Sequence, residues 1–200
     1  MRKTAAVAWK EVRSYFSSPM AYAVAGVFVG LTGYFFVDGL SGPIPEATVR
    51  PYTDSATFVL VLLAPLLTMR LLAEEHKLGT SELLLTAPIR DWEVVLGKFL
   101  ASLTFFIASI ALTLFYVALL YWVGNPDTGP ILTAYLGLVL FAGAALSIGL
   151  FTSSITDNQI VAAVLAAGAL LMLTVIQLAA DQTGGVIATV LSEVSMAEHY

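Results

Sequence analysis

Residues 70–98, RLLAEEHKLGTSELLLTAPIRDWEVVLGK, are the stretch that decides how this chain folds. They contain four of the nine lysines and arginines and five of the fourteen acidic residues of the chain. The sequence on either side of them is almost free of charge. A polar segment between two long apolar ones is typical of a loop that joins two membrane-spanning helices. We therefore expect residues 74–98 to form a water-exposed loop.

The loop contains residues that end helices and residues that begin them. Gly79 accepts the left-handed conformation that terminates a helix, and Thr80 or Ser81 can cap the helix that follows. Pro88 ends that second helix because it has no N–H to donate. Asp91 is expected to cap a third helix, which enters the membrane. The pattern predicts a short helix held between two breaks.

The short helix, residues 81–86, carries Glu82 in its first turn, where a carboxylate meets the positive end of the helix dipole. Leu83, Leu84 and Leu85 follow and are expected close to water. A short apolar helix at a membrane surface is suited to docking into a groove of another protein. We therefore expect this loop to contact a partner.

The composition indicates an integral membrane protein. Hydrophobic residues make up 58% of the chain and charged residues 12%, whereas about 25% of a soluble domain is charged. The mean hydropathy is +0.88. The chain has no cysteine, which excludes disulfides, thiolate metal sites and a cysteine nucleophile.

Five stretches are apolar over roughly the 20 residues that a helix needs to cross a bilayer. The predicted fold class is therefore all-α, a polytopic transmembrane helical bundle with five spans in a single domain over residues 17–200. A further segment, residues 184–195, is too short to cross and is expected to form a re-entrant or interfacial helix. The expected spans are residues 17–37, 55–73, 99–123, 131–153 and 158–180.

Residues 1–16 are expected to form an amphipathic helix at the membrane surface. Apolar residues recur on one face of this helix, and basic residues flank that face. Such a helix places its apolar side in the interface and its cations towards anionic headgroups. It serves either as a simple anchor or as a contact for a partner. The apolar residues are Ala5, Trp9, Val12 and Phe16, and the basic ones are Arg2, Lys3, Lys10 and Arg13.

Small residues offer surfaces on which helices can pack closely. Gly26 and Gly30 form a G-x-x-x-G pair in the first span, and Gly33 lies about one turn further on. Gly143 and Ser147 offer a similar surface in the fourth span. Packing within the chain and pairing with a second subunit are both open uses of these surfaces.

The basic residues indicate how the chain is oriented. With the N-terminus in the cytoplasm, Arg50 is the only lysine or arginine outside, as the positive-inside rule favours. Acidic residues occur on both sides of the membrane, so the net charge of −5 indicates no particular partner.

The sequence lacks the usual signatures of an enzyme. Acidic, basic and histidine side chains, which intramembrane chemistry requires, are missing from the interiors of the expected spans. Glu74, Glu75 and His76 are the best catalytic candidates, but the only other histidine, His199, lies on the opposite side. There is no H-E-x-x-H, G-x-S-x-G or G-x-x-x-x-G-K-[ST] motif. We expect no catalytic, cofactor or metal site in this chain.

The central loop resembles the loop between the second and third spans of permease subunits of ABC-2 type transporters. It is most similar to that of the gliding-motility-associated permeases. The resemblance rests on the motif E-x-x-x-G-T-x-E-x-L-L-x-x-P-I, residues 75–89, and on Leu96-Gly97-Lys98. It extends from the N-terminal arm to the fifth span. The family usually has six spans, and residues 184–195 are similar to its re-entrant element.

The resemblance implies a permease that forms the substrate pathway of an exporter as a homo- or heterodimer in the inner membrane of a prokaryotic cell. Two separate ATP-binding cassette subunits would bind ATP and Mg²⁺ and hydrolyse the ATP. The loop would contain a coupling helix seated on the ATPase, with the N-terminal arm beside it as a connecting helix. The residues implied to form or approach this coupling element are Glu74, Glu75, Gly79, Thr80, Glu82, Leu83, Leu84 and Pro88.

A protein of another class could use the same loop. A membrane anchor or assembly protein would dock a cytoplasmic factor through it without moving any substrate. The two hypotheses differ in whether a Walker-motif ATPase is encoded beside this chain and co-purifies with it. Neither hypothesis involves nucleic acid.

Overall fold

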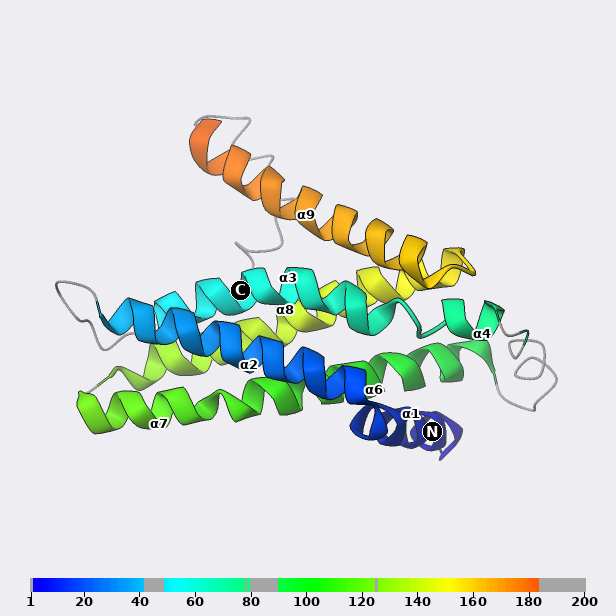
Figure 1. Ribbon diagram of the computed structural model, residues 1–200, viewed down its shortest axis with the longest axis horizontal. Coiled ribbons are helices and arrows are strands. Elements are labelled where there is room, and N and C mark those ends of the chain that lie inside the picture. Colours follow the sequence, from blue (N-terminus) through cyan, green and yellow to red (C-terminus); the bar gives the residue numbers. More distant parts are fainter. Residues whose placement is uncertain (1, 42–48, 78, 80–89, 125, 184–200) are drawn as a thin grey trace.

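The computed structural model describes residues 2–41, 49–77, 79, 90–124 and 126–183, and all the regular structure in these ranges is helical (Figure 1). This agrees with the predicted all-α class. The helices are α1 Arg2–Ser17, α2 Pro19–Leu40, α3 Arg50–Thr68, α4 Ala73–Lys77, α6 Asp91–Leu112, α7 Leu114–Val123, α8 Thr128–Ile155 and α9 Gln159–Thr183.

Within the described residues, five helical stretches are long and apolar enough to cross a membrane, which confirms the predicted polytopic bundle. The third consists of α6 and α7 together. The five stretches are Pro19–Leu40, Arg50–Lys77, Asp91–Trp122, Thr128–Ile155 and Gln159–Ile176. The segment at residues 184–195 lies outside the described residues.

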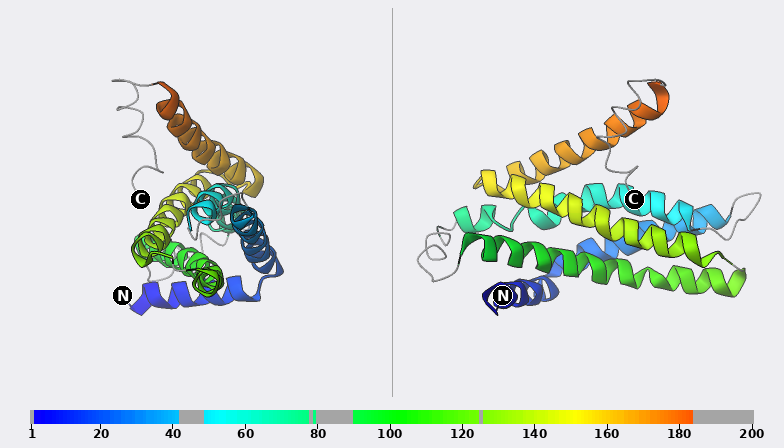
Figure 2. Two further views of the ribbon diagram at one scale, coloured as in Figure 1. Left: turned by 90° about the vertical axis from the view of Figure 1, so that its left-hand side faces the viewer. Right: turned by 180° about the vertical axis from the view of Figure 1, so that it is seen from behind.

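The second span, α3, is the centre of the bundle and is more buried than the other four. It packs against α2, α8 and α9. α9 contacts α8 and α3 but leans away from the bundle towards its C-terminal end (Figures 1 and 2). α1 lies across one end of the bundle and packs against α6 (Figure 2). The largest fully buried side chains include Tyr52, Phe28, Phe106, Leu60, Leu67, Leu138 and Leu146.

The second span begins earlier than the sequence suggested. Pro51, which precedes the expected span of residues 55–73, occupies the first turn of α3, where a missing N–H costs nothing. α3 continues through Pro65 and ends at Thr68. A short non-helical stretch, residues 69–72, separates it from α4. The polar loop is therefore entered through a break in the helix.

The expected cap of the helix after the central loop is wrong by one residue. Arg90, not Asp91, is the N-cap of α6, and its backbone N–H donates to the Glu93 carboxylate at 3.1 Å. Asn158 caps α9, because its side-chain oxygen accepts from the backbone N–H of Ile160 at 2.9 Å. At α9 the cap residue itself supplies the acceptor for the first turn, whereas at α6 the acceptor is the Glu93 carboxylate and the cap residue is the donor.

The glycines predicted for helix packing have different surroundings. A methyl group at Gly26 or Gly30 would meet no atom within 4 Å, so packing inside the described part of the chain does not use this pair. At Gly33 it would lie 2.7 Å from the hydroxyl oxygen of Tyr116, which requires glycine there. Gly143 has ordinary contacts with Phe99 and Leu103. Ser147 is exposed and donates to the Gly143 carbonyl at 2.9 Å.

Candidate functional site

Three helices meet around the buried side chain of Lys98, at the start of α6. Its ammonium lies 2.8 Å from a carboxylate oxygen of Glu75 on α4 and 3.4 Å from one of Glu11 on α1. The Lys98 side chain is 3% exposed, and those of Glu75 and Glu11 are 17% and 15% exposed. We call Lys98, Glu75 and Glu11 the charged junction.

The charged junction exists because α1 approaches α6 very closely. A methyl group on Gly97 would lie 2.7 Å from Cγ1 of Val7 and 3.2 Å from the backbone nitrogen of Ala8. Only glycine allows this approach. Gly97 therefore brings the two helices together, and the adjacent Lys98 meets the only acidic residue of α1, Glu11.

Because the charged junction is buried, the loss of any one of its three charged groups is costly in free energy. Ion pairs removed from water gain little net stability, but removing one partner leaves an uncompensated charge and costs about 3–5 kcal/mol. Two carboxylates share the single ammonium of Lys98. α1, α4 and α6 should therefore move together. Separating any one of them would expose a buried charge to water or leave it without its partner.

A second set of contacts joins the end of α1 to the end of α3. The hydroxyl of Tyr15 donates to the backbone oxygen of Leu67 at 3.2 Å. Burial raises the pKa of Tyr15 far above its usual value, so this hydroxyl keeps its proton. The guanidinium of Arg70 lies 5.6 Å from the centre of the Tyr15 ring and donates to the Ser18 hydroxyl at 3.3 Å. The bend between α1 and α2 is thus attached to α3.

The break between α3 and α4 is held by Ser153 of α8. Its hydroxyl oxygen accepts from the backbone N–H groups of Leu72 and Ala73, both at 3.1 Å. The same hydroxyl donates to the backbone oxygen of Met69 at 3.1 Å. A broken helix leaves such groups without partners, and here one side chain satisfies three of them. The α3–α4 break is therefore fixed to the end of α8.

α4 has one further contact, with the turn between α8 and α9. Nδ1 of His76 lies 3.6 Å from a carboxylate oxygen of Asp157. The Asp157 side chain is 80% exposed, so the pair contributes little to stability. It nevertheless places the polar end of α4 beside that turn.

The structure describes three of the predicted coupling residues. Glu75 belongs to the charged junction, and Glu74 lies beside it on α4, partly buried. Gly79 has a φ of +69° and donates its N–H to the His76 oxygen at 3.1 Å, which confirms the predicted left-handed end after α4. Thr80, Glu82, Leu83, Leu84 and Pro88 lie outside the described residues.

Sequence reasoning missed the side chains that hold this region together. Lys98 belongs to the Leu96-Gly97-Lys98 motif, and Glu11 is the only acidic residue of the basic N-terminal helix. Nothing in their sequence spacing predicted that the two side chains form an ion pair. Tyr15 and Ser153 carried no motif. Their role follows from helices that are distant in sequence, and only the three-dimensional arrangement shows it.

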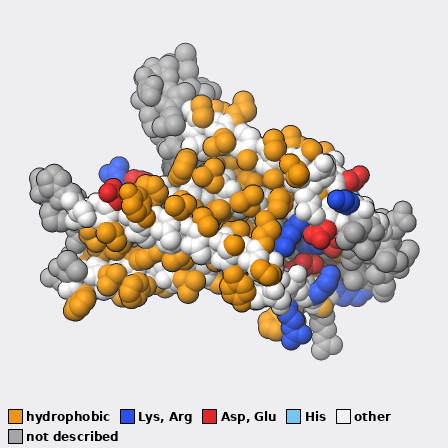
Figure 3. Space-filling view, viewed as in Figure 1, with side chains coloured by type: hydrophobic (Ala, Val, Ile, Leu, Met, Phe, Trp, Pro, Cys, Tyr) orange, Lys and Arg blue, Asp and Glu red, His pale blue; other side chains and the backbone are white. Residues whose placement is uncertain are grey.

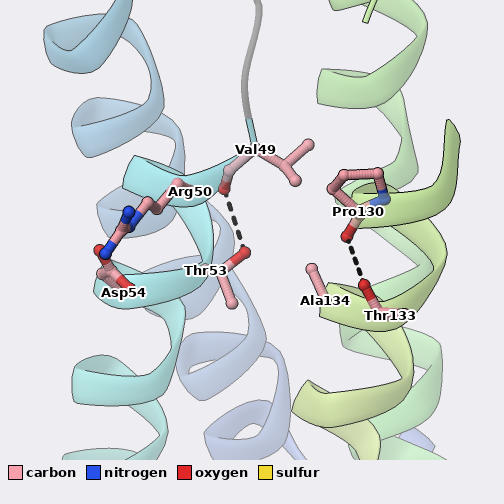
Figure 4. Close-up of a pocket in the computed structure, with 7 residues that line it drawn as sticks. All are labelled: Val49, Arg50, Thr53, Asp54, Pro130, Thr133 and Ala134. Atoms are coloured by element: carbon pink, nitrogen blue, oxygen red, sulfur yellow. Dashed lines mark hydrogen bonds between the residues drawn. The ribbon is translucent and has the colours of Figure 1, made fainter. Parts of the chain in front are cut away.

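The opposite end of the bundle contains a pocket of about 320 Å³ between the first turns of α3 and α8. Figure 4 shows Arg50 and Asp54 side by side at its α3 wall. The hydroxyls of Thr53 and Thr133 donate to the Val49 and Pro130 carbonyls of their own helices. The protons of these two hydroxyls are therefore already used in hydrogen bonds within their own helices.

A network of hydroxyl groups lies next to this pocket, at the break between α6 and α7. The Tyr52 and Thr113 hydroxyl oxygens are 2.6 Å apart, and Tyr135 donates to the Thr113 backbone oxygen at 3.0 Å. Tyr116 donates to the Val29 oxygen at 2.6 Å. Tyr116 is therefore a partly buried contact between α7 and α2, whereas Trp122 is 86% exposed.

Charged groups are distributed unequally along the bundle. Figure 3 shows apolar side chains along the bundle and a concentration of charged ones at the end where α1 and α4 lie. At the other end, Arg50 is the only lysine or arginine among the described residues. The charged junction is thus part of the strongly basic and acidic end of a membrane protein.

Comparison with known proteins gives one family. The family described as "ABC-2 family transporter protein" matches residues 45–197, about three quarters of the chain. The protein "Probable multidrug ABC transporter permease YbhS" of Escherichia coli (strain K12) is 30% identical over 115 residues, which are 58% of this chain and 30% of that protein. The protein of the same name from Escherichia coli O157:H7 matches equally.

The match spans less than a third of the length of these curated relatives. A comparison with solved structures found no match. The family match covers four of the five membrane-spanning stretches and the central loop. The chain therefore belongs to the ABC-2 family of transporter proteins.

Proposed function

We propose that this chain is the permease subunit of an ABC-2 type exporter, which forms the substrate pathway and is driven by a separate ATP-binding cassette ATPase. ATP and Mg²⁺ are bound by that partner. Within the family, the loop motif at residues 75–89 favours the gliding-motility-associated permeases. The observation that carries the proposal is the charged junction, because it joins α1, α4 and α6 at the base of the loop that the resemblance implies to contact the ATPase.

In this mechanism the ATPase acts on the loop, and the charged junction passes the resulting movement to the membrane-spanning helices. The ATPase grips the segment from Gly79 to Pro88, and a nucleotide-driven movement displaces it. α4 is attached to α1 and α6 through Lys98, and the α3–α4 break is attached to α8 through Ser153. The displacement therefore reaches α3, α6 and α8 as a rigid-body movement.

The proposed orientation places the N-terminus and the charged junction in the cytoplasm and the Arg50 pocket outside, in the inner membrane of a prokaryotic cell. The unequal distribution of lysine and arginine supports it. The chain has no cysteine, so single cysteines can report each side. A membrane-impermeant maleimide should label Asp127→Cys in intact spheroplasts and Lys77→Cys only after lysis. The reverse pattern would exclude this orientation.

A second permease subunit is part of the proposal. The face of α2 around Gly26 and Gly30 has no contact within the described residues, and the resemblance implies a dimer. A G-x-x-x-G face allows close helix–helix contact in a membrane. Cross-linking between copies that carry cysteine at Gly26 would test whether this face meets a second copy of this chain or a different permease.

The decisive experiment is a test of whether a Walker-motif ATPase is encoded beside this chain and co-purifies with it. We expect a stable complex whose ATPase activity depends on the permease. Leu84→Asp should abolish that dependence without affecting insertion, because it places a charge in an apolar docking surface. Leu84→Met keeps the apolar contact and is the control. A Leu84→Asp variant with normal stimulation, or the absence of any ATPase partner, would favour the membrane-anchor alternative.

A further inference from the structure

The outward face of α1 is basic, although the helix contains an acidic residue. The inward face, with Thr4, Ala8, Glu11 and Tyr15, lies against the bundle, and Glu11 is held there by Lys98. Arg13 and Lys10 are exposed on the other side. The charged junction therefore removes the only carboxylate of α1 from the outward face and leaves that face cationic.

Lys10 keeps its access to solvent. Its ammonium lies 3.4 Å from the Glu11 carboxylate, but its side chain is 74% exposed. A long, exposed pair of this kind is weak. The Lys10 ammonium can therefore leave Glu11 and bind another anion at little cost in free energy.

An aromatic residue lies among these cations. Trp9 is 65% exposed, and it lines a shallow hollow of about 410 Å³ together with Lys10 and Arg13. Ala6, Ser14 and Ser17 complete the hollow. Exposed tryptophan is typical of the headgroup region of a membrane, where its ring is apolar and its N–H finds an acceptor.

The position of α1 brings this hollow to the membrane surface. α1 runs across the bundle at the end of the spans (Figure 2), and Ser18 alone separates it from α2, the first membrane-spanning helix. A helix that lies across the ends of spanning helices lies in the plane of the interface. The hollow is therefore at the depth of lipid phosphates.

We propose that the face of α1 formed by Trp9, Lys10 and Arg13 is a binding site for the headgroup of an anionic phospholipid. The Arg13 guanidinium matches a phosphate with two parallel N–H donors, and Lys10 adds a second positive charge. Trp9 lies against the glycerol region. A zwitterionic headgroup carries its own ammonium and gains less from these cations, so the site selects for net negative charge.

Trp9 itself provides a local probe, because the chain has only three tryptophans. Trp92→Phe/Trp122→Phe leaves Trp9 as the single fluorophore. The full chain is placed in nanodiscs of mixed phosphatidylcholine and phosphatidylglycerol, with bromine on the acyl chains of one lipid or the other. We expect brominated phosphatidylglycerol to quench Trp9 more strongly than the same fraction of brominated phosphatidylcholine.

Lys10→Gln/Arg13→Gln should remove most of the excess quenching of Trp9 by brominated phosphatidylglycerol. Each basic residue near an anionic surface contributes roughly a fivefold preference for the anionic lipid. Quenching by brominated phosphatidylcholine should persist in the variant, which shows that α1 still lies at the membrane. The matched control is Lys77→Gln/Arg90→Gln, which removes two bases of the same end and should keep the excess.

Equal quenching by the two lipids in the parent, or an excess that survives in Lys10→Gln/Arg13→Gln, would overturn the proposal. Loss of the excess when an ATPase partner is bound would also overturn it, because the face would then belong to that partner. Lipid binding here does not require that the chain exports a substrate. Its failure is therefore distinguishable from failure of the proposed function.

Discussion

The ammonium of Lys98 lies 2.8 Å from the carboxylate of Glu75, and the two residues begin and end the polar loop on which the chain is organised. One contact thereby closes the base of the loop. Glu11 adds the N-terminal helix to the same ammonium. The contact therefore joins α1, α4 and α6 at the base of the loop.

Lys98→Met is expected to remove the buried cation that the Glu75 and Glu11 carboxylates share. Breaking a buried ion pair on one side costs about 3–5 kcal/mol. Thermal unfolding in detergent should show this loss, and Glu75→Gln in the same chain should restore part of it. Lys77→Met, which removes an exposed lysine of α4, is the control. A Lys98→Met protein as stable as Lys77→Met would contradict a structural role for the junction.

The sequence predicted the elements of this region but not their contacts. The five spans, the polar loop and the left-handed Gly79 followed from local patterns of apolar residues and helix-ending residues. The pairing of Lys98 with Glu75 did not, because each charge was equally compatible with water. Which charges are buried depends on how closely α1 and α6 approach, and that is set by Gly97.

The N-terminal arm shows that a sequence pattern can predict one apolar face of a helix and leave a second packing face unrecognised. Ala5, Trp9 and Phe16 predicted the apolar side, but the side packed on the bundle is centred one residue earlier, on Thr4, Glu11 and Tyr15. The arm has apolar residues on both faces, one for the protein and one for the membrane. The spacing of apolar residues alone cannot distinguish the face that packs on the protein from the face that meets the membrane, since both environments favour apolar side chains.

Ser153→Ala is expected to destabilise the α3–α4 break. The change leaves the N–H groups of Leu72 and Ala73 and the Met69 oxygen without their present partner. Each unsatisfied buried group costs about 1–3 kcal/mol. The midpoint of thermal unfolding should fall, and the loop should become more sensitive to limited proteolysis.

Ser154→Ala is the matched control, because the exposed Ser154 hydroxyl bonds only to the Phe151 oxygen of its own helix. It should leave both measurements unchanged. If the two variants unfold at the same temperature, Ser153 does not hold the break.

Gly149→Ala is expected to force α3 and α8 apart. The added methyl group would overlap the Thr68 hydroxyl and lie 2.8 Å from the Thr68 Cβ. Overpacking of this kind costs about 1–3 kcal/mol, which thermal unfolding can measure. Thr68→Ala should relieve part of the cost.

Gly168→Ala is the matched control in another spanning helix, because a methyl group there meets no atom within 4 Å. Replacing a helical glycine without a clash removes a cost of up to about 1 kcal/mol, so this variant should be neutral or stabilising. Equal effects of the two substitutions would show that α3 and α8 are not in close contact at Gly149.

Tyr52→Phe is expected to loosen the break between α6 and α7. Thr113 donates its hydroxyl proton to the Ile110 oxygen at 2.6 Å, so Tyr52 is the donor in the 2.6 Å contact between their hydroxyls. Losing this buried hydrogen bond should cost about 0.5–1.5 kcal/mol, measured by thermal unfolding, whereas the exposed Tyr121→Phe should cost nothing. Because the two hydroxyls act on one break, the losses from Tyr52→Phe and Thr113→Val should add to more than the loss in the double variant. Simple additivity would mean that the two residues stabilise the third span independently, and that the hydrogen bond between their hydroxyls contributes nothing.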